Sequence, residues 1–441
     1  MSPRREPVAQ TRALPSEADV VVIGGGIVGT TAAYFLAGKG LRVVVLEKGE
    51  IAGEQSSRNW GFLRQQGRSP AELPLIKRSI EIWDDIQRES GEDLGYRRTG
   101  TLYVSDQKDA PEAWQVWMDT CRDLNIGVSM LTAAQTQEAL PSTIKWTHGI
   151  QTPSDGFAEP ARAVPFIARS ATARGVTIMQ GCAARVLETA GGGVAGVHTE
   201  KGFVKTGAVL CAAGAWTSLF LRRHGIRLPQ LVAKASVLRT VPMKEISRFG
   251  GVGFREFTVR RRDDGGYNIA RPMGWTYEIV PDVFRYMKEF WPAFMQQRQS
   301  MKLRIKGSFF EELGRPTNWS SNDETPFEKK RVWDPVPDDA VLDLAYQSFR
   351  RAFPNAGASK LESWAGMIDI TPDAAPVIGK LPGIEGLHIA TGFSGHGFAM
   401  GPGGGRLAAD IITNGEKVVD PSPYLFERLS TTKIARDLSP N

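Results

Sequence analysis

Unbroken apolar runs near the start of the chain predict buried strands on either side of a helix. Residues 20–23 are four β-branched residues in a row, and a second apolar run covers residues 41–46. The stretch between them, from about residue 27 to residue 38, reads as a helix. Strands that are apolar at every position are typical of parallel sheets covered on both faces. We therefore expect residues 19–47 to form a βαβ unit in a parallel sheet.

The rest of the chain alternates between this pattern and a different one. The segment RRDDGGY, residues 261–267, is a hairpin signal inside residues 231–280, which read as antiparallel strands. Beyond the βαβ unit we expect helices at about residues 75–86, 110–124, 161–174 and 340–352, and strands at residues 176–179, 194–199, 203–205 and 208–212. The βαβ-like pattern thus occurs in pieces at the start, middle and end of the chain.

Three glycines after the first strand carry the first functional signal. Gly24, Gly26 and Gly29 match G-x-G-x-x-G between an expected strand and an expected helix. The first glycine permits the tight turn, the second lets the backbone approach a pyrophosphate, and the third lets helix and strand pack closely. Glu47 ends the second strand, where an acid accepts hydrogen bonds from a ribose diol. This pattern predicts dinucleotide binding and leaves NAD and FAD open.

Two later segments distinguish between these cofactors. VLCAAGAWTSLF, residues 209–220, follows a strand, and LHIATGFSGHGFAMGPGGGRLAADII, residues 387–412, reads as strand, glycine loop and helix. An NAD dehydrogenase needs neither segment. A two-domain flavoprotein needs both. The first segment forms one side of the dinucleotide-binding site, and the helix of the second points its N-terminus at the flavin ring. FAD is therefore the expected cofactor.

These segments also carry a resemblance to a known family. The chain resembles the D-amino-acid oxidase, glycine oxidase and sarcosine oxidase family of FAD enzymes over about residues 18–415. The motifs that carry it are DVVVIGGGIVG, VLEKG, DGFAEPARAV, VLCAAGAW, WAGMIDITPDAAPVIG and GFSGHGFAMGPGGG. The resemblance is specific near both ends of the chain and weak in residues 100–150 and 231–355.

The predicted fold class is α/β. A Rossmann-like FAD-binding domain with a parallel sheet is interleaved with an α+β substrate domain built on an antiparallel sheet. The expected segments are a disordered leader (residues 1–17), the FAD-binding domain (18–95, 151–230 and 360–415), the substrate domain (96–150 and 231–359) and a C-terminal tail (416–441).

The resemblance implies a set of FAD-binding residues. Gly24, Gly26 and Gly29 would hold the pyrophosphate, Glu47 the adenosine ribose, and Lys48 would lie near the adenine end. The backbone of Val186 would contact the adenine. The remaining expected FAD-binding residues are Ile27, Val28, Ser56, Ser57, Asn59, Trp60, Gly61, Ala213, Gly214, Trp216, Gly366, Met367, Gly395, His396, Gly397, Phe398 and Ala399.

Three of the residues near the expected flavin have competing interpretations. Trp60 either contacts the flavin or is a core aromatic. Arg58 is either a phosphate contact or a solvated loop charge. His396 either donates a hydrogen bond near the flavin, and then belongs to the catalytic residues, or is a satisfied structural histidine. The helix that starts after it would stabilise the negative charge of the reduced flavin.

The chemistry shared by the family is oxidation of a C–N bond. A hydride passes from the α-carbon of a neutral amine to flavin N5, the resulting imine is hydrolysed, and O2 or another acceptor takes the electrons. The implied substrate is an amino acid or secondary amine, such as an N-substituted glycine, an iminodiacetate-like compound or a D-amino acid. Some relatives attach FAD through a cysteine in the segment matching residues 366–371 or through a histidine in the first loop; this chain has neither. Noncovalent FAD is therefore expected.

The usual anchors for a substrate carboxylate are missing. Glycine-oxidase relatives have an arginine where Met367 and Ile368 stand, and sarcosine-oxidase relatives have a lysine where Ala399 stands. Arg64, just after the flavin loop, is the favoured replacement.

Other cations are weaker candidates. Arg271 would share one strand face with Tyr267 and Ile269, and it is the second arginine expected to bind substrate. For each of Arg255, Arg260 and Arg271 the competing interpretation is a solvated strand arginine. Lys234 and Lys306 are candidates for the lysine that governs oxygen reactivity in sarcosine-oxidase relatives.

Composition adds limits. The chain has 54 Lys and Arg against 48 Asp and Glu, an excess that favours anionic substrates but contains no concentrated basic tract for nucleic acid. No apolar run approaches the roughly 20 residues of a membrane span. Three scattered cysteines form no metal or disulfide pattern, and no apolar stretch follows the polar leader, so we expect a cytoplasmic protein without a bound metal.

Four alternatives remain open on the sequence alone. The chain could be an FAD-binding subunit of a larger dehydrogenase, a 2-hydroxy-acid oxidoreductase on the same fold, an NAD-dependent dehydrogenase, or a relative of the tRNA-modifying branch of this fold.

Overall fold

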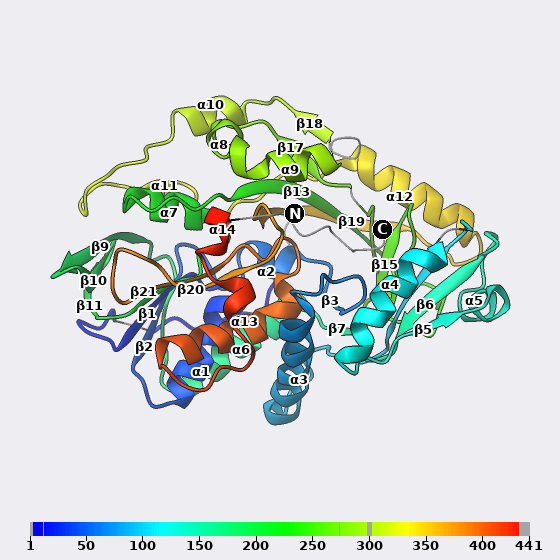
Figure 1. The fold of residues 1–441 in the computed structure, drawn as a ribbon, viewed down its shortest axis with the longest axis horizontal. Helices are drawn as coiled ribbons and strands as arrows, with labels where there is room; N and C mark the ends of the chain where they lie inside the picture. Colours follow the sequence, from blue (N-terminus) through cyan, green and yellow to red (C-terminus); the bar gives the residue numbers. More distant parts are fainter. Residues whose placement is uncertain (1–2, 12, 109, 273, 298–301, 432–441) are drawn as a thin grey trace.

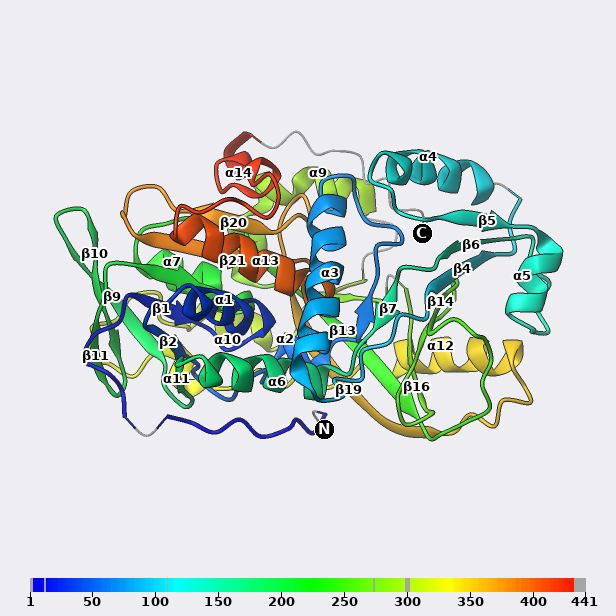
Figure 2. The same ribbon diagram turned by 90° about the horizontal axis from the view of Figure 1, so that it is seen from below.

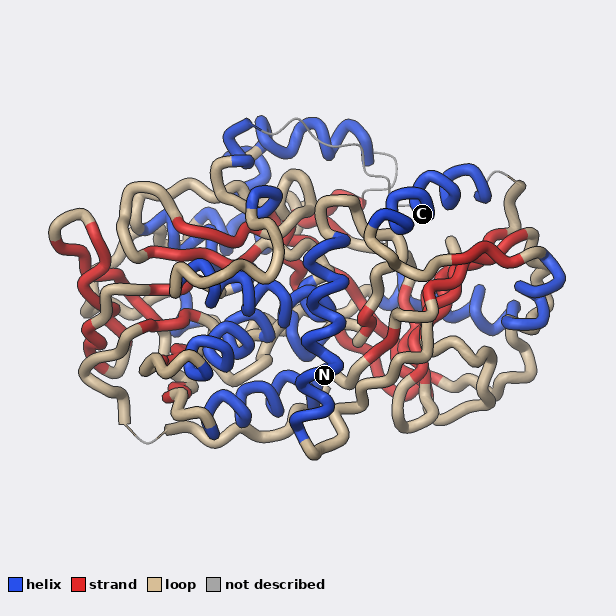
Figure 3. Tube along the Cα trace, turned by 60° about the horizontal axis from the view of Figure 1, so that its bottom comes forward, coloured by secondary structure: helices blue, strands red, loops and turns tan. Residues whose placement is uncertain are grey.

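The computed structural model describes residues 3–11, 13–108, 110–272, 274–297 and 302–431. Two large sheets organise it, and Figures 1 and 2 show them in different halves of the molecule, with helix α3 (Leu73–Ser90) between them. Figure 3 shows that helices surround both groups of strands.

The first sheet has the parallel arrangement expected of a dinucleotide-binding domain. Its strand order is β20-β21-β12-β1-β2-β8. All neighbours are parallel except β20 and β21. The strands are β1 (Val20–Ile23), β2 (Val43–Leu46), β8 (Thr177–Met179), β12 (Val209–Cys211), β20 (Val377–Lys380) and β21 (Leu387–Thr391). Because β1, β2, β12 and β21 are buried at every position, the apolar runs in the sequence reflect a sheet covered on both faces.

Helices α1 (Ile27–Gly38), α6 (Pro160–Ala173) and α13 (Gly397–Ile412) pack beside this sheet and beside one another. A hairpin-based sheet of β9 (Ala184–Ala190), β10 (Gly193–Thr199) and β11 (Gly202–Lys205) extends the same half. The expected βαβ unit at the start of the chain is confirmed by β1, α1 and β2.

The second sheet is mostly antiparallel. Its order is β18-β17-β13-β16-β15-β14-β4-β6-β5, with β19 paired to β13. Only β14/β4 and β17/β18 are parallel within the described residues. The strands are β4 (Thr101–Ser105), β5 (Ser129–Leu131), β6 (His148–Thr152), β13 (Leu231–Thr240), β14 (Gly251–Gly253), β15 (Thr258–Arg261), β16 (Tyr267–Ala270), β17 (Thr276–Glu278), β18 (Lys302–Arg304) and β19 (Lys360–Ile370). The predicted combination of a parallel sheet with an interleaved antiparallel one is confirmed.

Shorter elements connect and cover the two sheets. β3 (Phe62–Leu63) pairs with β7 (Gly156–Phe157), and α2 (Gln55–Arg58) precedes them. The remaining helices are α4 (Ala110–Asp123), α5 (Ala133–Ala139), α7 (Thr217–Arg223), α8 (Pro281–Arg285), α9 (Met287–Gln297), α10 (Ser308–Leu313), α11 (Pro326–Lys329), α12 (Asp339–Ala352) and α14 (Arg428–Thr431), with 3-10 turns at Gly214–Trp216 and Ser422–Tyr424.

Two segments differ from their expected places. The described part of the leader is held to the first half of the molecule, because the N–H groups of Glu6 and Thr11 donate to the carbonyls of Ala161 and Ile178, each at 3.0 Å. Residues 360–370 were expected in the FAD-binding domain, yet they form β19 and pair with β13 of the second sheet. The other domain boundaries stay predictions, and residues 432–441 of the expected tail lie outside the described residues.

None of the helices in the described ranges combines the length and apolarity that crossing a membrane requires. The cytoplasmic location stays a prediction.

A buried ion pair ties the second sheet to the loop after α2. Arg260 on β15 is fully buried, and its guanidinium donates to the Glu159 carboxylate (2.6 Å) and to the Trp60 carbonyl (2.6 Å). Asn268 on β16 donates to the same carbonyl at 3.0 Å. Arg260 therefore holds the backbone of Trp60 through its carbonyl oxygen. Because it is paired with Glu159, it is not a free cation.

We expect Arg260→Met to lower the free energy of unfolding by about 3–5 kcal/mol, because it leaves the Glu159 carboxylate buried with less compensation. Chemical denaturation measures this change. The matched control is Arg255→Met, which breaks a half-exposed pair with Asp106 (2.7 Å) and should cost about 0–1 kcal/mol. Equal losses in the two variants would contradict the structural role given to Arg260.

Candidate active site

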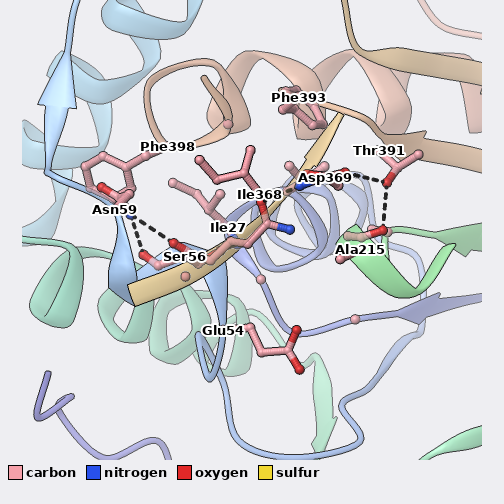
Figure 4. A pocket seen from close by; sticks show the side chains of 18 of the residues that line it. Ile27, Glu54, Ser56, Asn59, Ala215, Ile368, Asp369, Thr391, Phe393 and Phe398 are labelled. Atoms are coloured by element: carbon pink, nitrogen blue, oxygen red, sulfur yellow. Dashed lines mark hydrogen bonds between the residues drawn. The ribbon is translucent and has the colours of Figure 1, made fainter. Parts of the chain in front are cut away.

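A single extended cavity collects segments from both halves of the chain, and Figure 4 looks into it. One end lies at the β1–α1 turn, next to which Glu47, the residue after β2, lines the cavity. The other end lies at the loop between β3 and α3, where Arg64 and Arg68 line it. Strand β19 and the start of α13 complete the wall with Ile368 and Phe398. The site is thus built where the two sheets approach each other.

The glycine turn at one part of this wall is shaped for a dinucleotide. Gly24 has φ +112°, and a Cβ there would lie 2.4 Å from the Ala212 carbonyl oxygen. A Cβ on Gly29 would lie 2.1 Å from the Gly24 oxygen, so Gly29 serves close packing and does not reach the wall. Gly26 lines the cavity at the N-terminus of α1, where backbone groups and the helix dipole favour a phosphate. The turn therefore fits the pyrophosphate of FAD.

Glu47 is fixed in the position expected for the ribose contact. Its two carboxylate oxygens accept the N–H groups of Gly25 and Gly49, each at 2.7 Å. Burial raises its pKa, and these hydrogen bonds oppose the rise. Lys48 also lines the cavity, but its ammonium donates to Glu54 (2.7 Å) and lies 4.4 Å from the Trp216 ring centroid. Lys48 thus connects Glu54 and Trp216, two other residues of the cavity wall.

Most of the residues that the sequence proposed for FAD come together in this cavity. Those in the wall are Gly24, Gly26, Ile27, Val28, Glu47, Lys48, Ser56, Asn59, Trp60, Ala213, Gly214, Trp216, Gly366, Gly395, His396, Gly397, Phe398 and Ala399. Ser56 has a further role, because its hydroxyl oxygen accepts the Ile27 N–H at 2.9 Å and so links α2 to α1. Arg58 is also in the wall, buried, and donates to the Trp333 carbonyl.

The other proposed FAD-binding residues are outside the wall for local reasons. Ala184, two residues before Val186 on β9, supplies the wall in its place. Met367 alternates along β19 with Gly366 and Ile368, which face the cavity. Ser57 is buried and donates to the Glu54 carbonyl (3.4 Å).

Gly61 also lies outside the wall. Its carbonyl accepts the Ala158 N–H at 3.0 Å, so it is engaged with the segment next to β7.

Arg271 was expected to bind substrate and does not line the cavity. Tyr267 and Ile269 are buried in the core of the second sheet, packed with residues of α12. The strand face that we assigned to the cavity is therefore the face that covers this core. The correction comes from tertiary packing, since periodicity identifies a face without saying what it packs against.

The other candidate cations are also engaged elsewhere. Arg255 pairs with Asp106 and Arg260 with Glu159. Lys234 donates to the Val336 carbonyl at 2.8 Å, and Lys306 lies 3.6 Å from Glu278. Neither lysine is among the wall residues in the described part of the chain.

Arg64 does line the cavity, and it has a partner that the sequence did not reveal. Arg64 donates to the Gln66 carbonyl (2.9 Å) and to the Tyr103 hydroxyl. Arg68, four positions later in the segment RQQGR, lines the cavity as well. The repeat of arginine within one loop was the available signal for Arg68.

Arg68 is a buried charge that forms no direct ion pair among the described residues, although Glu72 is close enough to oppose the fall of its pKa. The residue is 5% exposed, and its Nε is buried without a hydrogen-bond partner. Within the described residues its guanidinium has no hydrogen bond or ion pair. Burial, and then the neighbouring Arg64, lower its pKa to about 9. A buried cation of this kind calls for an anionic ligand.

The loop that carries both arginines is rigidly held. The buried Asp155 carboxylate accepts the N–H groups of Gln65 (2.7 Å) and Gln66 (3.2 Å), and the hydroxyl of Thr101 (2.6 Å). The Arg68 carbonyl accepts the indole N–H of Trp117 at 3.0 Å. The arginines are therefore positioned before any ligand binds.

His396 lies in the wall at the start of α13 and is paired with a residue that we did not predict. Its Nδ1 is 2.5 Å from Oε1 of Glu72, which precedes α3. Glu72 has no sequence signal that links it to His396, because the contact depends on how α3 packs against α13.

Comparison with known proteins agrees with this site. Among solved structures, an L-amino acid deaminase from Proteus myxofaciens, in complex with anthranilate, superimposes with a TM-score of 0.93 at 31% identity, covering 97% of both chains. Among curated proteins, glycine oxidase of Pseudomonas putida is 25% identical over 92% of this chain and 98% of its own length.

Mitochondrial sarcosine dehydrogenase of Mus musculus is 26% identical over 96% of this chain but only 42% of its own length. The chain thus spans less than half the length of that relative.

The match to a family decides between the cofactors that the glycine turn left open. The family model described as FAD dependent oxidoreductase matches residues 19–411, which include the glycine turn, Arg64, Arg68 and the start of α13. With its walls shaped for a dinucleotide and the family model spanning both halves, this chain belongs to the family of FAD-dependent oxidoreductases.

Proposed function

We propose that this enzyme oxidises the C–N bond of an anionic α-amino acid and that Arg68, with Arg64 beside it, binds the substrate carboxylate. The observation that carries the proposal is the buried guanidinium of Arg68, which lines the cavity and has no hydrogen-bond or ion-pair partner among the described residues. A carboxylate is the ligand that matches a guanidinium in charge and shape. Arg64 adds a second positive charge to the same part of the wall.

The likeness to two L-amino acid deaminases of Proteus, with TM-scores of 0.93 and 0.90, favours a primary L-α-amino acid. An N-substituted glycine is the second candidate, supported by the similarity to sarcosine dehydrogenase along 96% of this chain. Both substrates carry a carboxylate next to the carbon that is oxidised, so both fit the same arginines. An uncharged amine lacks the contact to the arginines and should bind more weakly.

FAD, when bound, supplies the hydride acceptor, and the residues of this chain supply position and electrostatics. The N-terminal end of α13, at His396 and Gly397, lines the cavity and would offer partial positive charge to a bound cofactor that becomes negative on reduction. Trp60, Phe62 and Trp275 give the wall an apolar surface, which excludes water from the reacting atoms and strengthens the contact to the arginines.

The proposal is tested by anaerobic reduction of the flavin. Purified enzyme is mixed without oxygen with L- and D-amino acids, sarcosine, iminodiacetate, 2-hydroxy acids and uncharged amines, and the flavin absorption near about 450 nm is followed. We expect α-amino acids or N-substituted glycines to bleach it, and uncharged amines, which lack the carboxylate, to bleach it far more slowly. Bleaching by 2-hydroxy acids alone, or by no compound, would refute the proposal; the latter result would favour a non-catalytic FAD-binding subunit. Readmission of air then separates an oxidase from a dehydrogenase.

Arg68→Met should raise KM for the acid substrate by about 10- to 100-fold, because a hydrogen bond to a charged group is worth about 1.5–3 kcal/mol. Steady-state kinetics on the acid and on its amide measures this effect, and the amide should be unaffected. The same variant removes an unpaired buried charge, so its stability without substrate should be unchanged or higher.

Arg271→Met is the matched control, since Arg271 lies outside the cavity wall. It should leave both KM values unchanged. An Arg68→Met variant that loses the acid and the amide in the same proportion would show that Arg68 does not bind the carboxylate.

Acid precipitation should release all of the flavin into the supernatant. The segment 366–371 contains no cysteine, and the one histidine among the wall residues of the described chain, His396, is engaged with Glu72. Absorbance of the supernatant and of the washed pellet measures the partition. Flavin that stays with the pellet would indicate a covalent bond.

A further inference from the structure

The pair of Glu72 and His396 is a built arrangement in the cavity wall that carboxylate binding does not use. Glu72 is the residue before α3, and His396 is the residue before α13. Oε1 of Glu72 lies 2.5 Å from Nδ1 of His396, while Oε2 accepts the hydroxyl (2.9 Å) and the N–H (3.2 Å) of Ser69. Both carboxylate oxygens are therefore held, and the orientation of the imidazole ring is fixed.

The charges around this pair define its protonation state. Burial pushes the pKa of Glu72 upward, but His396 and Arg68 outweigh it and hold that pKa at about 2. Burial, followed by Arg68, lowers the pKa of His396; Glu72 opposes this, and Arg64 adds to it. Tyr424, whose hydroxyl donates to the Ala71 carbonyl at 2.6 Å, is the other titratable group near Glu72.

An ionised carboxylate can only accept a hydrogen bond, so Nδ1 of His396 carries the proton that points to Glu72. In a neutral imidazole the lone pair then lies on Nε2. Within the described residues Nε2 has no hydrogen-bond partner, and the side chain of His396, which lines the cavity, stays 20% exposed. An unprotonated nitrogen thus belongs to a side chain that lines the same cavity as Arg64 and Arg68.

We propose that Nε2 of His396 accepts a proton from the ammonium group of the substrate and that Glu72 positions the ring for this transfer. This inference rests on the proposed function, in which Arg68 binds the carboxylate of the same substrate. An amino acid enters as its zwitterion at neutral pH, whereas hydride loss from the α-carbon requires a nitrogen with a free electron pair. In the transfer an N–H bond of the ammonium breaks, an Nε2–H bond forms, and no electrons leave the substrate.

The imidazolium that results is paired with the Glu72 carboxylate, which compensates for the nearby positive charges of Arg64 and Arg68. Those arginines favour return of His396 to its neutral form, so the proton is readily passed on to solvent. Glu72 and Arg68 thereby act in opposite directions on one acceptor.

The first test is the pH profile of anaerobic flavin reduction by His396→Asn, with the amino acid that reduces the parent enzyme fastest. Asparagine keeps a donor toward Glu72 but has no basic nitrogen. We expect a loss of about 10²- to 10⁴-fold at pH 7 that shrinks toward none as the pH passes the pKa of the substrate's own amine. A loss of the same size at every pH would overturn the proposal while leaving the proposed function intact.

Glu72→Gln tests the positioning residue. Removing the carboxylate lowers the pKa of His396 further, so the acidic limb of the profile should move to lower pH, and the rate at neutral pH should fall less than in His396→Asn. A purely structural role for Glu72 would change the rate without moving that limb, and this result would contradict the proposal.

The chain offers a matched control in His198→Asn. His198 and Glu188 form a similar pair (2.7 Å) on the hairpin of β9 and β10, where Glu188 is exposed and neither residue lines the cavity. Its profile should coincide with that of the parent enzyme.

A spectroscopic measurement decides the case independently of turnover. The protein has five histidines, so labelling of histidine with ¹⁵N and comparison with His396→Asn identifies the His396 signals in the flavin-bound enzyme. A proton on Nδ1 and none on Nε2 at pH 7 supports the proposal. A proton on Nε2 overturns it, even if no amine in the panel reduces the flavin and the proposed function fails on its own.

Discussion

The burial of Arg68 is the constraint around which the substrate end of the cavity is organised. A lone guanidinium taken out of water costs several kcal/mol, and Arg64 in the same wall increases that cost, as the lowered pKa of Arg68 reflects. The chain tolerates this because the loop is anchored by the buried Asp155 and by Trp117. An anionic ligand supplies the missing direct partner, so the same free energy that destabilises the empty site favours binding of the correct ligand.

The cofactor end of the cavity is formed by residues close together in the sequence, and it could therefore be predicted from the sequence. The tight turn at Gly24, the close packing at Gly29 and the acid at Glu47 are all set by a contiguous βαβ unit. Each local preference agrees with the final structure there. The interleaved α/β and antiparallel architecture was likewise visible, because apolar runs and hairpin signals report on strands wherever they occur.

What could not be predicted depends on which elements meet. Arg271 was assigned to the cavity from its strand face, but that face covers the core beside α12. Val186 does not line the cavity, whereas Ala184, two residues earlier, does; Met367 does not, whereas its neighbours Gly366 and Ile368 do. A strand presents alternate residues to one face, and its register fixes which of them face the site. The pairing of β19 with β13 of the second sheet joins segments far apart in the chain, and the sequence pattern did not show it.

The contact of Glu72 with His396 is the clearest case of a contact that the sequence could not predict. The two residues are 324 positions apart, and each precedes a helix, α3 and α13. Those helices are joined by Ser79, whose hydroxyl donates to the Ala399 carbonyl (2.6 Å) and accepts the Gly403 N–H (2.9 Å). Because this contact sets how far one helix slides along the other, it also sets the distance between the carboxylate and the imidazole at their starts. The position of the proton acceptor is therefore determined by helix packing away from the cavity, and not by the loop motif in which His396 stands.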